Sequence, residues 1–77
     1  MPSADEKVIE FHIARLTDKR VDVRLKSIAE LEAMGAKAAM ALEALKACHD
    51  QADEEEVKKA AREAGYKIFM AGKEPPG

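Results

Sequence analysis

The chain has 77 residues, of which 15 are acidic and 13 are basic, so its net charge is -2. A chain of this length forms one small domain, expected over residues 1–77, and its evenly mixed charges leave no basic stripe for nucleic acid. The first residues carry charges where a signal peptide needs an apolar segment, and no apolar run approaches the ~20 residues of a membrane span. Since the single cysteine fits a reducing compartment, we expect a cytoplasmic protein with no membrane partner.

The composition favours helix along the whole chain. Alanine is abundant, aromatic residues are scarce, and all three prolines lie near the ends. An interior rich in Ala, Leu, Glu, Lys and Met is typical of helices, so we predict an all-α fold. The four helices are expected at about 4–16, 20–34, 36–49 and 53–71, with a disordered tail at 73–77.

The first helix begins with a capping-box pattern, in which Ser3 and Glu6 stand three residues apart. Phe11 lies off the apolar stripe of this helix, and Thr17 or Asp18 in the following turn can cap the second helix. The predicted apolar stripe of the first helix is Val8, Ile9, Ile13 and Leu16.

The second and third helices are separated by a glycine. Gly35 is placed to supply the left-handed conformation that ends a helix, so the second helix should stop near Met34. The third helix, rich in alanine, has Met40, Leu42 and Leu45 as its larger apolar residues. One face of the second helix is predicted to consist of Val21, Leu25, Ile28 and Leu31.

The fourth helix begins in an acidic run. Asp53 and Glu56 have capping-box spacing, and glutamates in a first turn are favoured by the helix dipole, so we prefer this explanation to a cation site. Gly65 predicts either a close crossing by a neighbouring helix or a bend, and Gly72 is expected to end the helix. Its buried face is predicted to be Val57, Ala60, Ala61, Ala64, Ile68 and Met70.

Two stretches of the chain are similar to each other, Asp18 to Gly35 and Asp50 to Gly72. Each has an aspartate, then a valine followed by a basic residue, then small and aliphatic residues. The pairs are Val23-Arg24 and Val57-Lys58. This pattern resembles the HEAT-like repeat family, in particular the short repeats of phycobilisome lyases.

The resemblance implies two stacked helical hairpins, about 4–34 and 36–71, as a fragment of a right-handed α–α superhelix. It also implies a ladder of polar contacts, in which Arg24 reaches Asp18 or Asp50 and Lys58 reaches Asp50. Because the second helix of each such hairpin usually lines the inner face, Arg24, Lys58 and Arg62 would bind a partner there.

Two units are few for a stable stack of repeats, because a repeat cannot bury its apolar face alone. The outer helices also carry more apolar side chains than two hairpins need. These side chains either form an interface with another protein, which includes a second copy of the chain, or fold back onto the core. The residues concerned are Phe11, Tyr66, Phe69 and Met70.

No arrangement of residues predicts catalysis, a metal site or a cofactor. Cys48 and His49 are neighbours and point about 100° apart on a helix, so they cannot both bind one ion without distortion of the helix. His12 is distant in sequence, and no glycine-rich phosphate loop or pair of carboxylates in an apolar pocket is present. We therefore expect a protein that is not an enzyme.

The sequence predicts a protein–protein interaction or scaffold module with the HEAT-like fold. One alternative is an accessory protein related to bilin lyases, which the resemblance suggests. The other is a nucleic-acid-binding helical module, which the acidic neighbours of its basic residues disfavour. Its candidate residues are Lys19, Arg20, Arg24, Lys58, Lys59 and Arg62.

Overall fold

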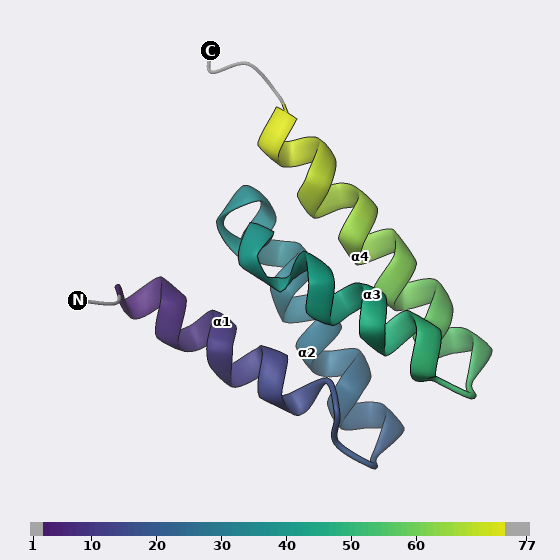
Figure 1. Ribbon diagram of the computed structural model, residues 1–77. Helices are drawn as coiled ribbons and strands as arrows, with labels where there is room; N and C mark the ends of the chain where they lie inside the picture. The colour runs from purple at the N-terminus through teal and green to yellow at the C-terminus, as the bar shows by residue number, and fades with distance from the viewer. Residues whose placement is uncertain (1–2, 74–77) are drawn as a thin grey trace.

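The computed structural model describes residues 3–73, and within that range the chain forms helices and turns without a strand (Figure 1). The all-α prediction is therefore confirmed. The predicted tail lies outside the described residues from position 74 on, whereas Gly72 and Lys73 belong to the last helix. The elements are α1 Ala4–Arg15, α2 Val21–Met34, the 3-10 segment η1 Gly35–Ala41, α3 Leu42–Gln51 and α4 Glu55–Lys73.

The prediction of four separate helices is corrected to three uninterrupted helical runs, because α2, η1 and α3 follow one another without a break over residues 21–51. Gly35 has φ 59° and ψ -137°. The positive φ was expected, but this ψ is far from the left-handed helical value, in a region open to glycine. The chain bends there and continues as a 3-10 turn, so α3 begins at Leu42 and not at Ala36.

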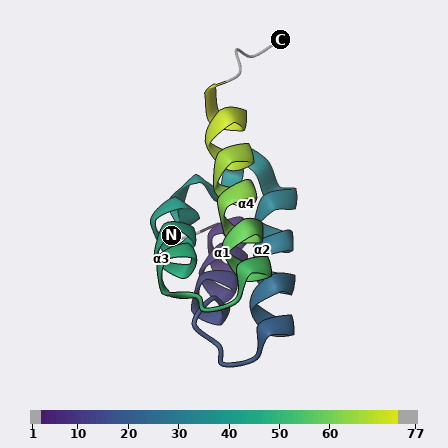
Figure 2. The same ribbon diagram turned by 90° about the vertical axis from the view of Figure 1, so that its right-hand side faces the viewer.

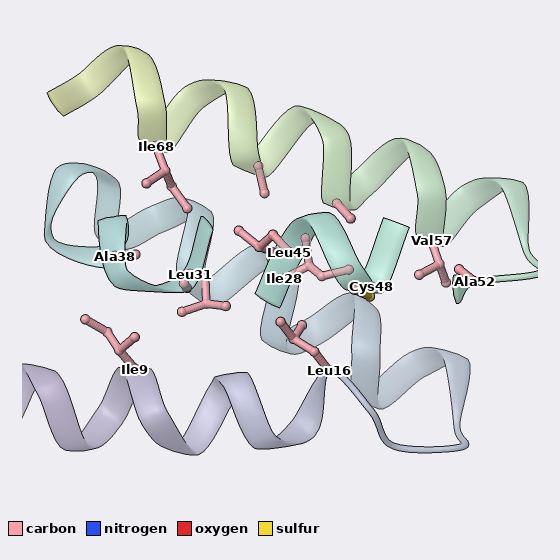
Figure 3. Packing of buried hydrophobic residues seen from close by; sticks show 13 residues of the cluster. Ile9, Leu16, Ile28, Leu31, Ala38, Leu45, Cys48, Ala52, Val57 and Ile68 are labelled. Carbon is pink, nitrogen blue, oxygen red and sulfur yellow. The ribbon is translucent and has the colours of Figure 1, made fainter. Parts of the chain in front are cut away.

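The helices alternate in direction along the chain (Figure 1). α1 and α4 lie on opposite sides of the 21–51 run (Figures 1 and 3). Figure 2 shows α4 nearest the viewer, with α2 and α3 on either side of it and α1 behind. α4 packs against α2, η1 and α3, whereas α1 packs mainly against α2 and η1.

The core lies between these layers and is built largely from small and aliphatic residues (Figure 3). Leu31 and Leu45 of the central run are fully buried. Two residues of the predicted apolar faces are not buried: Val8 of α1 is 45% exposed and Met70 of α4 is 40% exposed, so these two predictions are wrong. α4 contributes Val57, Ala61, Ala64 and Ile68 to the core.

The helix starts agree only in part with the predicted caps. Ser3 Oγ accepts a hydrogen bond of 3.1 Å from the Glu6 N–H, as predicted. α2 has Arg20 at its N-cap without a side-chain bond, so the predicted cap by Thr17 or Asp18 is wrong. α4 begins at Glu55, so the position before the helix is Glu54 and the predicted N-cap, Asp53, lies one residue too early.

Candidate functional site

The outer face of α4 carries three large apolar side chains. Tyr66, Phe69 and Met70 are 66%, 48% and 40% exposed, so they do not fold back onto the core. Residues three and four apart on a helix are neighbours on its surface, so these side chains form one stripe. α4 buries the opposite face against the rest of the molecule, since Ile68 is fully buried.

Phe11, the fourth predicted apolar contact residue, is 57% exposed but lies on α1, away from the α4 stripe (Figure 1). The Arg15 guanidinium carbon lies 5.1 Å from the centroid of the Phe11 ring, and the His12 ring meets it edge-on at 5.2 Å. On α4, Lys73 Nζ lies 4.4 Å from the centroid of the Phe69 ring. The predicted apolar residues therefore form two separate sites, each beside a cation.

A groove of about 240 Å³ lies between α3 and α4, beside the apolar stripe. Gly65 lines it, and a Cβ built on this glycine would meet no atom within 4 Å. The predicted close crossing at Gly65 is therefore wrong, and α4 continues through this position without a break. The missing side chain leaves space in the groove. The lining residues are Leu42, Leu45, Lys46, His49, Ala61, Arg62, Gly65 and Tyr66.

The groove has a basic border. Lys46 and Arg62 line it from opposite helices, and neither forms an ion pair within residues 3–73. The third basic residue, His49, places its Nδ1 3.0 Å from Asp50 Oδ1. From residue 58 to 73, α4 carries five basic residues and only Glu63 as an acid, although the whole chain is net acidic.

Arg24 is largely buried, with 13% of its side chain exposed. Its Nη1 donates a 3.1 Å hydrogen bond to Glu54 Oε1, which lowers the pKa of Glu54. The predicted partners Asp18 and Asp50 are both wrong. Within the described residues, Arg24 Nε is buried without a hydrogen-bond partner.

Asp18 bonds to Arg20, and not to Arg24, through both of its carboxylate oxygens. Arg20 Nε and Nη2 donate to Oδ1 and Oδ2 at 3.1 and 3.2 Å, and the Arg20 backbone N–H donates to Oδ1 at 2.8 Å. These bonds lower the pKa of Asp18 to about 2. Asp18 therefore organises its own turn and does not link one hairpin to the other.

The predicted basic contact residues are divided by the structure. Lys58 is half-buried on α4, and its predicted ion pair with Asp50 is not among those formed by residues 3–73. Arg62 is exposed and lines the α3–α4 groove beside Tyr66. Arg24 belongs to a second groove of about 300 Å³, with Asp18 and Cys48 among its lining residues. Only Arg62 therefore joins the apolar stripe of α4.

One polar contact was missed from the sequence. Ser27 is 1% exposed, and its Oγ lies 3.2 Å from His12 Nδ1, which joins α2 to α1. A serine in a row of buried apolar positions was the available signal, because a buried hydroxyl requires a partner.

Burial raises the pKa of the Cys48 thiol, which makes this thiol a poor nucleophile.

The described residues hold no group of three or more side chains suited to a metal ion, and none of their helices is long and apolar enough to cross a membrane. Comparison with protein families, curated proteins and solved structures finds no match for the chain. No family is therefore shown for the chain, and the resemblance to HEAT-like repeats stays a prediction.

Proposed function

We propose that the protein is a small helical scaffold that binds another protein chain through the outer face of α4 and has no catalytic activity. The observation that carries this proposal is the stripe of Tyr66, Phe69 and Met70 on that face. Single exposed apolar residues are common on protein surfaces. Three large ones side by side on a helix whose other face is buried indicate an interaction site.

The residues beside the stripe support binding of a protein. Arg62 and Tyr66 are one turn apart, and arginine and tyrosine are among the residues that contribute most to protein interfaces. Lys73 covers the Phe69 ring at 4.4 Å, which gives this part of the stripe both an apolar surface and a positive charge. Such a surface suits a partner with apolar and acidic side chains.

We further propose that α1 with α2, and α3 with α4, are two units of a HEAT-like stack. Three observations support this: the alternating helix directions, the repeated Asp…Val-Arg/Lys pattern, and the link from Arg24 of the first unit to Glu54 beside the second (Figure 1). A terminal unit leaves its outer face uncovered, so a partner or another copy of the chain would cover α4. A cytoplasmic location accords with the free, buried thiol of Cys48.

The direct test is affinity capture with the full chain, using Phe69→Asp as the disrupting variant. Val8→Asp is the matched control, because Val8 is 45% exposed, close to the 48% of Phe69, and lies on α1. We expect Phe69→Asp to lose the captured protein and Val8→Asp to retain it. Retention by both variants would rule out the outer face of α4 as the binding surface.

Self-association is tested separately by light scattering during size-exclusion chromatography at two protein concentrations. A mass that rises with concentration in the wild type, and not in Phe69→Asp, would identify a second copy as the partner. A monomer at both concentrations would leave a different protein as the partner. Circular dichroism of each variant verifies that it is folded.

A further inference from the structure

We propose that the α3–α4 groove binds one large aliphatic or aromatic side chain of an acidic protein segment, with the flanking carboxylates held by Lys46 and Arg62. This inference rests on the proposed function and names the chemistry of its partner. The groove adjoins the α4 stripe because Tyr66 belongs to both and Arg62, which also lines the groove, lies one turn before Tyr66.

The shape of the groove sets the size of the group that enters. Its volume of about 240 Å³ suits one large side chain, and Leu42, Leu45 and Ala61 give it an aliphatic lining. Gly65 leaves its part of the lining open, since nothing lies within 4 Å of the position of a Cβ. Burial of one leucine- or phenylalanine-sized group is worth roughly tenfold or more in affinity.

The charges that line the groove indicate which groups should flank the bound side chain in the partner. Three basic residues and no acidic residue line it among those described, and Lys46 and Arg62 are exposed without ion pairs there. Two acidic residues lie close by without lining the groove. Asp50 is within hydrogen-bond distance of His49, and Glu63 lines a neighbouring surface of α4 with Arg62. Since Lys46 and Arg62 come from different helices, carboxylates on both sides of an apolar anchor would each meet a cation.

Two other anionic partners fit these features less well. A lipid bilayer presents a plane of headgroups and offers no single apolar group that would fill a hollow of this volume. A nucleic acid has phosphates but brings planar bases, whereas the groove has an aliphatic lining at Leu42 and Leu45. An acidic protein segment supplies both the carboxylates and the apolar side chain.

The test begins with selection of a random dodecapeptide phage library on the immobilised full chain. We expect enriched peptides to carry a large apolar residue flanked by Asp or Glu. A synthetic copy of the best peptide is then titrated by fluorescence anisotropy against the wild type, Gly65→Leu and Gly72→Leu. Both glycines lie in α4 and neither Cβ would meet an atom within 4 Å, but only Gly65 lines the groove.

Gly65→Leu should weaken the peptide roughly tenfold or more, because the new side chain fills the groove, and Gly72→Leu should leave it nearly unchanged. Lys46→Glu and Arg62→Glu should each weaken it, with a loss that shrinks as salt is added. Two results would overturn the proposal that the groove binds an acidic segment: enriched peptides without acidic residues, or a peptide that binds Gly65→Leu as tightly as the wild type.

The experiments distinguish failure of the groove proposal from failure of the proposed function of the α4 stripe. Peptides that bind Gly65→Leu normally but not Phe69→Asp would overturn the groove and leave the α4 stripe as the binding surface. A library that yields no peptide overturns the groove, and the capture experiment then decides the stripe. The selection could also yield no acidic peptide while the chain binds phosphatidylserine vesicles or an oligonucleotide. If Gly65→Leu does not reduce that binding, the groove proposal is overturned.

Discussion

The two faces of α4 use apolar residues in opposite ways. The inner face is made of small and aliphatic residues, and Ala61, Ala64 and Ile68 on it are at most 2% exposed. The outer face carries the larger Tyr66 and Phe69, which are about half exposed or more. The largest apolar side chains of this helix therefore contribute little to the core.

The small inner residues let α4 approach the rest of the molecule closely. Figure 2 shows α4 in front of α2 and α3, and Ala61 and Ala64 face that contact without occupying much space. A phenylalanine at either position would have to displace α2 or α3, because protein cores are closely packed. The comparison teaches that the size of a side chain, as well as its hydrophobicity, differs between the buried and the exposed face of α4.

The sharpest test of the comparison uses two adjacent residues. Ile68→Ala should lower the free energy of unfolding by about 2–5 kcal/mol, because it leaves a cavity in the core. Phe69→Ala should lower it by less than about 1 kcal/mol, since it loses only an exposed ring and the contact with Lys73. Urea unfolding followed by circular dichroism measures both. Equal losses would show that Phe69 is a core residue.

The next largest effect is expected where the inner face of α4 meets the bend of the 21–51 run. A Cβ at Gly35 would lie 4.0 Å from Ala71 Cβ, which is ordinary contact, so space does not forbid a side chain. The backbone conformation disfavours a side chain, because φ 59° with ψ -137° is strained for any residue other than glycine. Gly35→Ala should cost about 1–3 kcal/mol in thermal or urea unfolding. An unchanged stability would mean that the bend relaxes into another conformation.

At Gly65, between the two faces of α4, a substitution should have the opposite sign. Gly65→Ala should raise the free energy of unfolding by about 0.5–1 kcal/mol, because alanine is the better helix former and its Cβ meets nothing within 4 Å. Gly72→Ala, near the end of the helix, should have a smaller effect. A loss of stability in Gly65→Ala would show that the α3–α4 groove closes in solution.

The smallest effect is expected from the polar contacts that precede α2 and α4. The folded pKa of Asp18 is about 2 and its ordinary value is 3.8, and the bond from Arg24 lowers the pKa of Glu54. For a lowered carboxylate pKa, the stabilisation is complete above the ordinary value and is lost as the pH falls through the folded one. Stability should therefore fall between about pH 4 and pH 2.

Urea midpoints measured across this range test the effect. Asp18→Asn and Glu54→Gln should each have a shallower loss of stability on acidification than the wild type. Val8→Ser, on an exposed apolar residue, should leave the slope unchanged. Identical slopes in all four proteins would show that neither carboxylate contributes to the acid response.

The sequence was sufficient for the helices but not for their connections. Helical periodicity and composition predicted the class, and the Ser3 cap and the positive φ of Gly35 followed from residue type alone. The 3-10 turn after Gly35 could not be predicted, because an alanine-rich stretch suits an α-helix equally well. Burial of Ala38 in that turn depends on contacts between distant parts of the chain.

The candidate site was predictable only in part for the same reason. Periodicity indicated surplus apolar residues on the outer helices, but only the fold decides that the helix of Phe11, α1, and the helix of Phe69, α4, lie on opposite sides of the 21–51 run (Figure 1). The partner of Arg24 was predicted among aspartates, whereas the position of α4 brings Glu54 within 3.1 Å. Gly65 lines the α3–α4 groove, which no local sequence pattern reveals.

The continuity of the 21–51 run restricts where this chain could accept an insertion. The segment between α2 and α3 contributes Ala38 and Ala41 to the interior, so it is a structural part and not a spacer. A peptide tag spliced into it would have to disrupt the interior, whereas residues 17–20 form an exposed or half-buried turn. That turn, and not the midpoint of the sequence, is the natural place to open the chain for fusion or circular permutation.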